Sequence, residues 1–335
     1  MKKNYTIKQV MTVLSGLTLA GMASISSAAV DGLELLDTIG EYRGEFKIYF
    51  AAKPSAGDLR GINRVGQNMA DASGVKLDTQ KPLTLNETRV AMIGAEDSSA
   101  SFEVDTLTGN FLFNGGMRQY RDEGSTKDLP QDTQAVGISY QWLEKYQLPV
   151  DPDQMKLAHV GGLNMATSDG SGGSKIFEKL KTVRYSRVID GLSVEGDARI
   201  VVHMGQRGEL AGMVYQWPKI GETLKLDGQM LRDPEAIRSQ ALKKIEAVTG
   251  KVEKAALTSA ELVIYDDGFG VAEPAYHFVV ERYFDYGDRE PVMIPYDFYI
   301  PTTKEPLAFY PFMEAGHVLP EQEGDEGKVD NGRDE

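Results

Sequence analysis

The sequence contains no cysteine among its 335 residues. A disulfide framework and a thiolate zinc site are therefore excluded, and the stability of the chain has to come from packed cores. A lipid anchor is excluded for the same reason, because there is no cysteine to acylate.

Histidine is also scarce, and its spacing argues against a catalytic metal. The four histidines are each at least 40 residues from the next along the chain. No His-Glu-x-x-His sequence occurs, so two imidazoles cannot bind zinc one helical turn apart beside a general base. His203 and His277 fall inside predicted strands and are interpreted as core or surface residues. The chain also lacks a Gly-x-Ser-x-Gly elbow and a phosphate-binding loop. We expect no catalytic residue, no metal site, no cofactor and no enzymatic activity; an enzyme of an unrecognised kind remains the alternative.

Long apolar runs are missing as well. The longest uncharged, mostly apolar stretch, residues 10–22, is too short to cross a bilayer as a helix. It follows three lysines and precedes Ser27 and Ala29, an order typical of a secretory signal peptide. We predict a signal peptide at 1–29, cleaved before Val30, and a secreted or periplasmic protein that is not a lipoprotein. Cleavage one residue earlier fits almost as well, and a buried or amphipathic N-terminal helix is the alternative.

Basic residues are too few to balance the acidic ones. The chain has 36 Lys and Arg against 50 Asp and Glu, and loss of the three signal-peptide lysines leaves 33 against 50, a net charge of −17. Such a surface repels nucleic acid and anionic lipid, so neither is expected as a partner. Residues 321–335 hold seven acids and two bases, the composition of an acidic disordered tail. Their spacing lacks the alternating oxygen ligands of a calcium loop.

Helical and strand-like periodicities alternate along the rest of the chain. Residues 30–121 favour strands and give a mostly β N-terminal region. Apolar residues at helical spacing predict a helix from Asp132 or Thr133 to about Leu148 and a second one from Pro234 to Gly250. Strands are predicted at 156–160, 182–189, 198–204, 209–217, 260–265, 275–284 and 293–300, and a Gly/Ser loop at 167–174. The pattern predicts an α+β fold with two units, 122–220 and 221–320, each a helix packed on an antiparallel sheet.

One family shares two of these segments. The stretch Val183-Arg184-Tyr185-Ser186-Arg187-Val188-Ile189-Asp190-Gly191-Leu192-Ser193-Val194-Glu195-Gly196 resembles the motif of the fungalysin/thermolysin propeptide. Leu262-Val263-Ile264-Tyr265, followed by Ala275-Tyr276-His277-Phe278-Val279, is similar to the hairpin of a PepSY domain. The resemblance implies a propeptide-like unit at 122–220 and a PepSY-like, cystatin-like unit at 221–320.

The resemblance also implies a function. Prodomains of this family chaperone and inhibit the metalloprotease that follows them, and free-standing PepSY proteins are thought to restrain proteases in the cell envelope. No protease follows in this chain, so the resemblance implies a non-enzymatic protein that inhibits or chaperones an exported metalloprotease in trans. The alternative is a structural or adhesion protein of the envelope or medium that uses the same fold.

Three neighbouring residues are candidates for contact with a partner. Arg184, Tyr185 and Arg187 belong to the types favoured at binding hot spots. Alternatively, they are the solvent-facing positions of a sheet.

Overall fold

The computed structural model describes residues 30–311 except for 97–98, 117–119, 121, 123, 169–173, 251, 253 and 288–289. The predicted signal peptide and acidic tail lie outside these described residues.

Strands make up about 45% of the described structure and helices 23%. The strands are β1 (Val30–Asp31), β2 (Lys47–Ala51), β3 (Leu83–Thr84), β4 (Arg89–Ile93), β5 (Ser101–Asp105), β6 (Phe111–Asn114), β7 (Met155–Ser168), β8 (Ser174–Ile189), β9 (Leu192–Met204), β10 (Leu210–Gln216), β11 (Ile220–Lys225), β12 (Lys254–Asp266), β13 (Val271–Phe284) and β14 (Val292–Pro301). The main helices are α1 (Ala56–Ala72), α2 (Asp132–Lys145) and α3 (Pro234–Thr249), preceded by a 3₁₀ helix, η1 (Leu33–Thr38).

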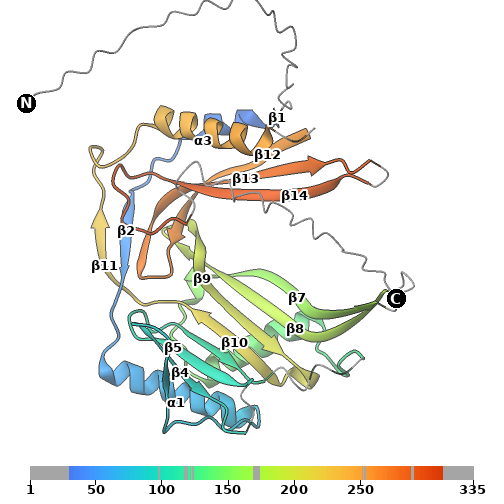
Figure 1. The fold of residues 1–335 in the computed structure, drawn as a ribbon. Helices are drawn as coiled ribbons and strands as arrows, with labels where there is room; N and C mark the ends of the chain where they lie inside the picture. The colour runs from blue at the N-terminus through green and yellow to red at the C-terminus, as the bar shows by residue number, and fades with distance from the viewer. Residues whose placement is uncertain are drawn as a thin grey trace, which may run out of the picture.

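All of these described strands join into one mixed sheet of fourteen strands. Its main path runs β11-β2-β13-β12-β9-β10-β6-β5-β4-β3, with β14 beside β13, β1 beside β12, and β8 and then β7 beside β9. In Figure 1 the sheet has a lower part, β3 to β10, and an upper part, β1, β2 and β11 to β14. The β7–β8 hairpin extends to one side of the lower part, and the β13–β14 hairpin extends above it (Figure 1).

The prediction of two helix-on-sheet units is therefore wrong. One continuous, mostly β sheet contains strands from both predicted units and from the N-terminal region. The N-terminal strand β2 pairs with β13 and β11, and β1 pairs in parallel with β12. Periodicity identifies strands but not their partners, and these pairings join residues far apart in the sequence. The boundaries at 121/122 and 220/221 stay predictions.

Both predicted helices are confirmed, and their local sequence explains their ends. The Asp233 carboxylate accepts a hydrogen bond from the backbone of Glu235, and Pro234 occupies the first turn of α3. At the start of α2 the Gln131 backbone amide donates to the Gln134 side-chain oxygen at 3.1 Å. The helix α1 was not predicted; it starts at a capping box between Ser55 and Asp58.

The helices cover one side of the sheet in each part. The lower core packs α1 and α2 against the sheet, and its largest fully buried side chains include Phe102, Phe113 and Tyr185. The upper core packs η1 and α3 against β12, β13 and β14 around Phe278 and Ile300, which are both 0% exposed. In the described part of the chain, the opposite side of each part is not covered by an α-helix.

A short parallel contact joins the two parts. In it, Ile264 to Asp266 of β12 pair with Val194 to Gly196 of β9. Gly196 has φ +89°, and a Cβ there would lie 2.2 Å from the backbone oxygen of Asp266. Only glycine fits this approach without displacing the backbone, so Gly196 is needed for the two parts to join.

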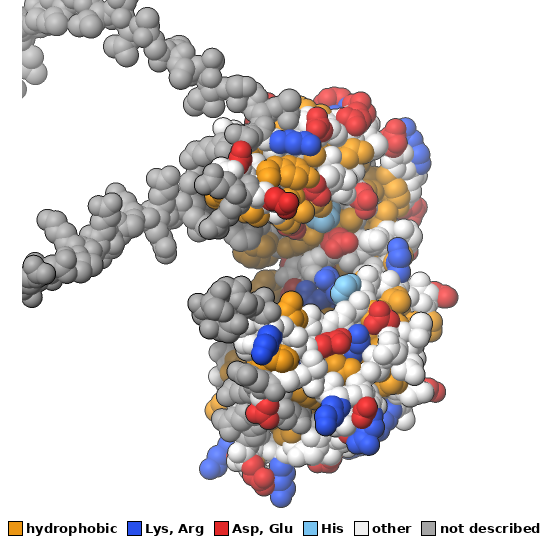
Figure 2. Space-filling model, turned by 90° about the vertical axis from the view of Figure 1, so that its right-hand side faces the viewer, with side chains coloured by type: hydrophobic (Ala, Val, Ile, Leu, Met, Phe, Trp, Pro, Cys, Tyr) orange, Lys and Arg blue, Asp and Glu red, His pale blue; other side chains and the backbone are white. Residues whose placement is uncertain are grey.

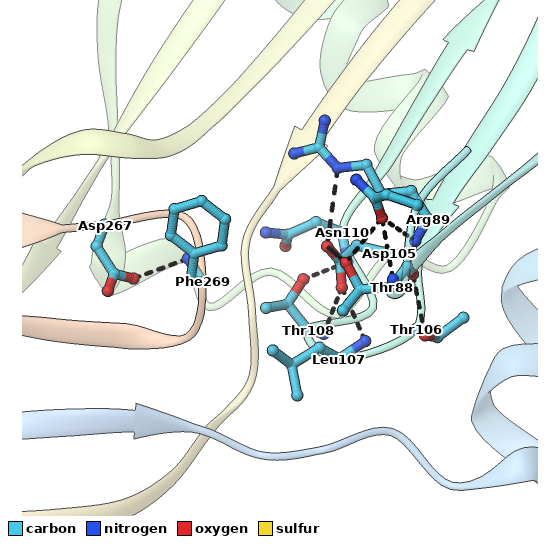
Figure 3. A network of polar contacts seen from close by, with 10 residues as sticks. Thr88, Arg89, Asp105, Thr106, Leu107, Thr108, Asn110, Asp267 and Phe269 are labelled. Atoms are coloured by element: carbon cyan, nitrogen blue, oxygen red, sulfur yellow. Dashed lines mark hydrogen bonds and ion pairs between the residues drawn. The ribbon is translucent and has the colours of Figure 1, made fainter. Parts of the chain in front are cut away.

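Two polar turns lie near this junction (Figure 3). The Asp105 carboxylate accepts hydrogen bonds from the Leu107 amide, at 2.8 Å, and from the Thr88 hydroxyl, at 3.2 Å. In the β12–β13 turn, the Asp267 carboxylate accepts from the Phe269 amide at 2.7 Å. A Cβ built on Gly270 would lie 3.8 Å from a methyl carbon of Thr108, so the two turns lie close together. Both carboxylates thus serve to fix backbone turns.

Candidate binding site between the two hairpins

Side chains along β8 point alternately to its two sides, so the three predicted partner-facing residues do not share one surface. Arg184 is exposed, whereas Tyr185 is 0% and Arg187 6% exposed. Side chains buried to this degree cannot form a surface patch together with Arg184. The interpretation of Tyr185 and Arg187 as partner-facing is therefore corrected, and Arg184 alone keeps an accessible side chain.

Tyr185 lies between β8 and α2. Its hydroxyl is 2.5 Å from the Ser139 hydroxyl, and its ring centroid is 5.3 Å from that of Tyr140. Burial raises the pKa of Tyr185 to about 12, so the phenol is neutral at physiological pH. Its role is to anchor the helix to the sheet.

Arg187 is buried at the junction of the two parts. Its Nε and Nη2 donate to the Gln154 side-chain oxygen at 3.0 and 2.9 Å, and its Nη1 donates to the Pro218 carbonyl at 2.8 Å. The guanidinium carbon lies 5.0 Å from the centre of the Trp217 ring. Burial lowers the pKa of Arg187, and the neighbouring Asp266 carboxylate opposes this effect.

Asp266 and this arginine both line a small pocket at the junction. Asp266 is 5% exposed and accepts a hydrogen bond from the Gly268 amide at 2.9 Å. Burial raises the pKa of Asp266 to about 6, with Asp267 and Asp197 contributing in the same direction. Sequence analysis missed Asp266, because it directly follows the predicted strand 260–265 and nothing near it in the sequence marks it as buried.

The larger feature is a hollow between the upper and lower parts of the molecule, seen in Figure 2. Its lower wall is the side of β7, β8 and β9 opposite α2, which we call the lower face. Cross-strand pairing places the following basic residues on this face: Lys156, His159, Arg184, Arg199 and His203. Lys, Arg and His side chains are visible along the lower border of the hollow in Figure 2. On β9 the acidic residues Glu195 and Asp197 alternate with Arg199, so the unpaired positive charge of the lower face comes from Lys156 and Arg184.

Hydrogen bonds fix two of these basic residues. The Nδ1 atom of His203 is 3.0 Å from the Thr182 hydroxyl, and burial lowers the pKa of His203. Arg199 donates to the Gly196 carbonyl at 3.4 Å and lies 3.7 Å from Asp197. The side chains of Lys156 and Arg184 form no hydrogen bond or ion pair with another described residue. They are therefore free to bind an anionic group.

The upper wall is the side of β12, β13 and β14 opposite α3, which we call the upper face. The acidic residues placed there by strand register are Glu261, Glu281 and Asp297. His277 lies among them, with Nε2 3.6 Å from the Asp297 carboxylate and its ring stacked on Tyr299 at 4.5 Å. The two faces that border the hollow therefore differ in charge.

A row of stacked rings leads from the upper face towards the end of the described chain. Tyr299 lies 4.6 Å from Tyr265, and Tyr265 lies 4.5 Å from Tyr310, measured between ring centroids. Burial raises the pKa of the Tyr299 phenol; Glu195 and Asp297 raise it further, and Arg184 lowers it. Arg184 on the lower face thus lies within electrostatic reach of Tyr299 on the upper face.

The outer strand of each hairpin has a free backbone edge. Among the described strands, β7 pairs only with β8, and β14 pairs only with β13. The strand β7 is 14 residues long and contains no acidic residue. Leu157 and Leu163 on it are 43% and 44% exposed. An unpaired edge of this length can add a strand from another polypeptide segment.

Within residues 30–311, as far as they are described, no three His, Asp or Glu side chains converge as metal ligands. No helix in the same part of the chain is long and apolar enough to span a membrane.

Comparison with known proteins leaves the family open. No family model matches the sequence, and no curated protein matches it. Among solved structures, an uncharacterized protein from Eubacterium rectale ATCC 33656 is similar at a TM-score of 0.43 and 11% identity. The similarity covers 78% of this chain and 84% of that one.

Proposed function

We propose that the protein is an exported, non-enzymatic binding module that receives an extended segment of a partner protein. The partner proposed is an exported metalloprotease, which the module inhibits or helps to fold in trans. The resemblance of 183–196 and 262–279 to protease prodomains motivates this proposal. The two hairpins offer a surface on which such a partner could bind.

The free edge of β7 is the observation that carries the proposal. Its backbone can donate and accept hydrogen bonds along 14 residues, and its lack of carboxylates avoids repulsion of an acidic segment. The exposed side chains of Leu157 and Leu163 add apolar area that a partner can cover.

The test uses a double variant on this edge and a matched control. Leu157→Lys/Leu163→Lys adds two charges to β7, whereas Leu83→Lys/Leu85→Lys adds the same two charges beside β3, where the leucines are 52% and 49% exposed. We expect the wild type and the control to slow a thermolysin-like metalloprotease, or to restore its activity after denaturation, and the β7 variant to lose the effect. If the wild type at micromolar concentration neither slows nor restores any such protease, the proposal is wrong.

A structural or adhesive role is the second candidate, and the β13–β14 hairpin supports it. Val292, Met293 and Ile294 near its tip are 45%, 44% and 37% exposed, and a strand edge lies beside them. This role predicts self-association that rises with protein concentration in sedimentation experiments. A strictly monomeric protein would contradict it.

A further inference from the structure

The lower face carries unpaired positive charge in an acidic protein. Lys156 and Arg184 are exposed and have no ion-pair partner among the described residues. Lys156 pairs with Ser186, two positions along β8 from Arg184, so both side chains lie on the same side of the sheet. His159 pairs directly with Arg184 and lies on the same side of the sheet. An acidic segment would meet favourable electrostatic attraction here.

The upper face repels such a segment, which restricts where it could bind. Glu261, Glu281 and Asp297 lie on that side of the sheet, and the Asp297 side chain is 63% exposed. An anionic polypeptide entering the hollow is therefore directed to the lower face.

The chain itself supplies an anionic segment near this place. Residues 321–335 contain seven acids and two bases, a net charge of −5. The described chain ends at Pro311, next to Tyr310, whose ring is joined by stacking through Tyr265 to Tyr299 at the hollow.

The intervening nine residues, 312–320, can span up to about 30 Å when extended. A linker this short holds the segment at an effective concentration on the order of millimolar. Individually weak surface charge pairs then suffice for substantial occupancy.

We propose that the acidic segment 321–335 binds in cis to the lower face around Lys156 and Arg184. The bound segment covers the basic side of the β7–β8 hairpin. If the proposed partner binds there as well, the segment competes with it; this consequence alone rests on the proposed function.

The test compares the full chain with a variant that ends at Pro320. A labelled peptide with the sequence of 321–335 is titrated into each, and binding is followed by fluorescence anisotropy. We expect the shortened chain to bind the peptide, and the full chain to bind it at least about tenfold more weakly, because its own segment occupies the face. Raising the salt concentration from about 50 mM to about 500 mM should abolish most of the binding to the shortened chain.

Charge reversals locate the site. In the shortened chain, Lys156→Glu/Arg184→Glu should weaken peptide binding about tenfold or more. The control Arg60→Glu/Arg64→Glu changes the net charge equally on exposed residues of α1 and should leave the affinity within about twofold. Thermal unfolding checks that both variants fold.

A second variant tests the proposal by changing the acidic segment and leaving the β7–β8 hairpin unaltered. Neutralising the seven acids of 321–335 in the full chain, as Asn and Gln, should raise its affinity for added peptide to that of the shortened chain.

Three outcomes would overturn the proposal. The first is equal peptide binding by the full and shortened chains, and the second is equal weakening by the control variant. The third is a dimer that disappears on truncation, because it would assign the segment to the face of a second copy. None of these measurements involves a protease, so failure of the proposed function leaves them interpretable.

Discussion

The upper and lower faces of the hollow have the same construction but differ in the charge of their unpaired side chains. Each is one side of a long antiparallel hairpin whose other side packs on a helix, α3 above and α2 below. The packed sides are both apolar, around Phe278 in one and Tyr185 in the other. The open sides diverge, with Glu261, Glu281 and Asp297 above and Lys156 and Arg184 below. Packing on a helix therefore requires apolar residues on only one side of each hairpin. The residues on the other side can be selected for binding.

Removal of a large core side chain from the upper part should have the largest effect. Phe278→Ala should lower the free energy of unfolding by about 3–5 kcal/mol, because the ring is 0% exposed and leaves a cavity. Both tryptophans, Trp142 and Trp217, belong to the lower core, so their fluorescence reports unfolding of that part.

We expect tryptophan fluorescence and far-UV circular dichroism of Phe278→Ala to shift together in urea, since β9–β12 pairing joins the two parts. Separate transitions would show that the halves unfold independently and would contradict a single cooperative sheet.

Stability of the junction should depend on pH through Asp266. Its folded pKa of about 6 lies above its ordinary value of 3.8, so the folded state binds the proton more tightly and stability falls as the pH rises between these values. The effect amounts to about 3 kcal/mol. Asp266→Asn should remove this contribution, so the stability of the variant relative to wild type should rise between pH 4 and pH 7. Urea unfolding at both pH values measures this difference, and an unchanged difference would mean that Asp266 is not buried as an acid.

A smaller loss of stability is expected when the hydroxyl of Tyr185, which anchors α2 to the sheet, is removed. Tyr185→Phe removes a hydrogen bond to Ser139 but keeps the ring, and Ser139 still donates to the Val136 carbonyl. The expected cost is about 1 kcal/mol, measured by chemical denaturation. A cost near that of Phe278→Ala would show that the hydroxyl network contributes as much as the ring packing.

The smallest change in stability is expected for Arg184, the residue next to Tyr185 in β8. Arg184→Ala should alter the free energy of unfolding by less than about 0.5 kcal/mol, because the side chain is exposed and unpaired among the described residues. A loss of several kcal/mol in the same denaturation assay would contradict the assignment of Arg184 to an open face.

The sequence was informative where local patterns decide the structure. The helices α2 and α3 and the β12–β13 hairpin follow from periodicity, proline and capping residues, all within a few positions of one another. The helix α1 was missed because Gly57, Gly61 and Gly66 interrupt its apolar pattern. Gly66 is nevertheless required, since a Cβ there would lie 2.5 Å from the Phe102 ring.

Local sequence patterns could not predict which strands pair when they lie far apart in the sequence. The contact of Gly196 with Asp266, and that of β2 with β13, join segments separated by about 70 residues or more, so nothing near either segment signals the partner. The same holds for the candidate site. Arg187 looks like a surface residue until Gln154 and Pro218 are brought around it.

The open edge of β7 also bears on how the protein behaves in concentrated solution. A strand of 14 residues with an unpaired edge is a template for fibril-like stacking with other copies of the chain. Adjacent glycines at Gly161 and Gly162, near the middle of the strand, weaken its tendency to stack, and the charge of Lys156 opposes it near one end. Replacing the two glycines with valine would straighten and stiffen this edge, and storage lifetime would shorten as precipitation set in.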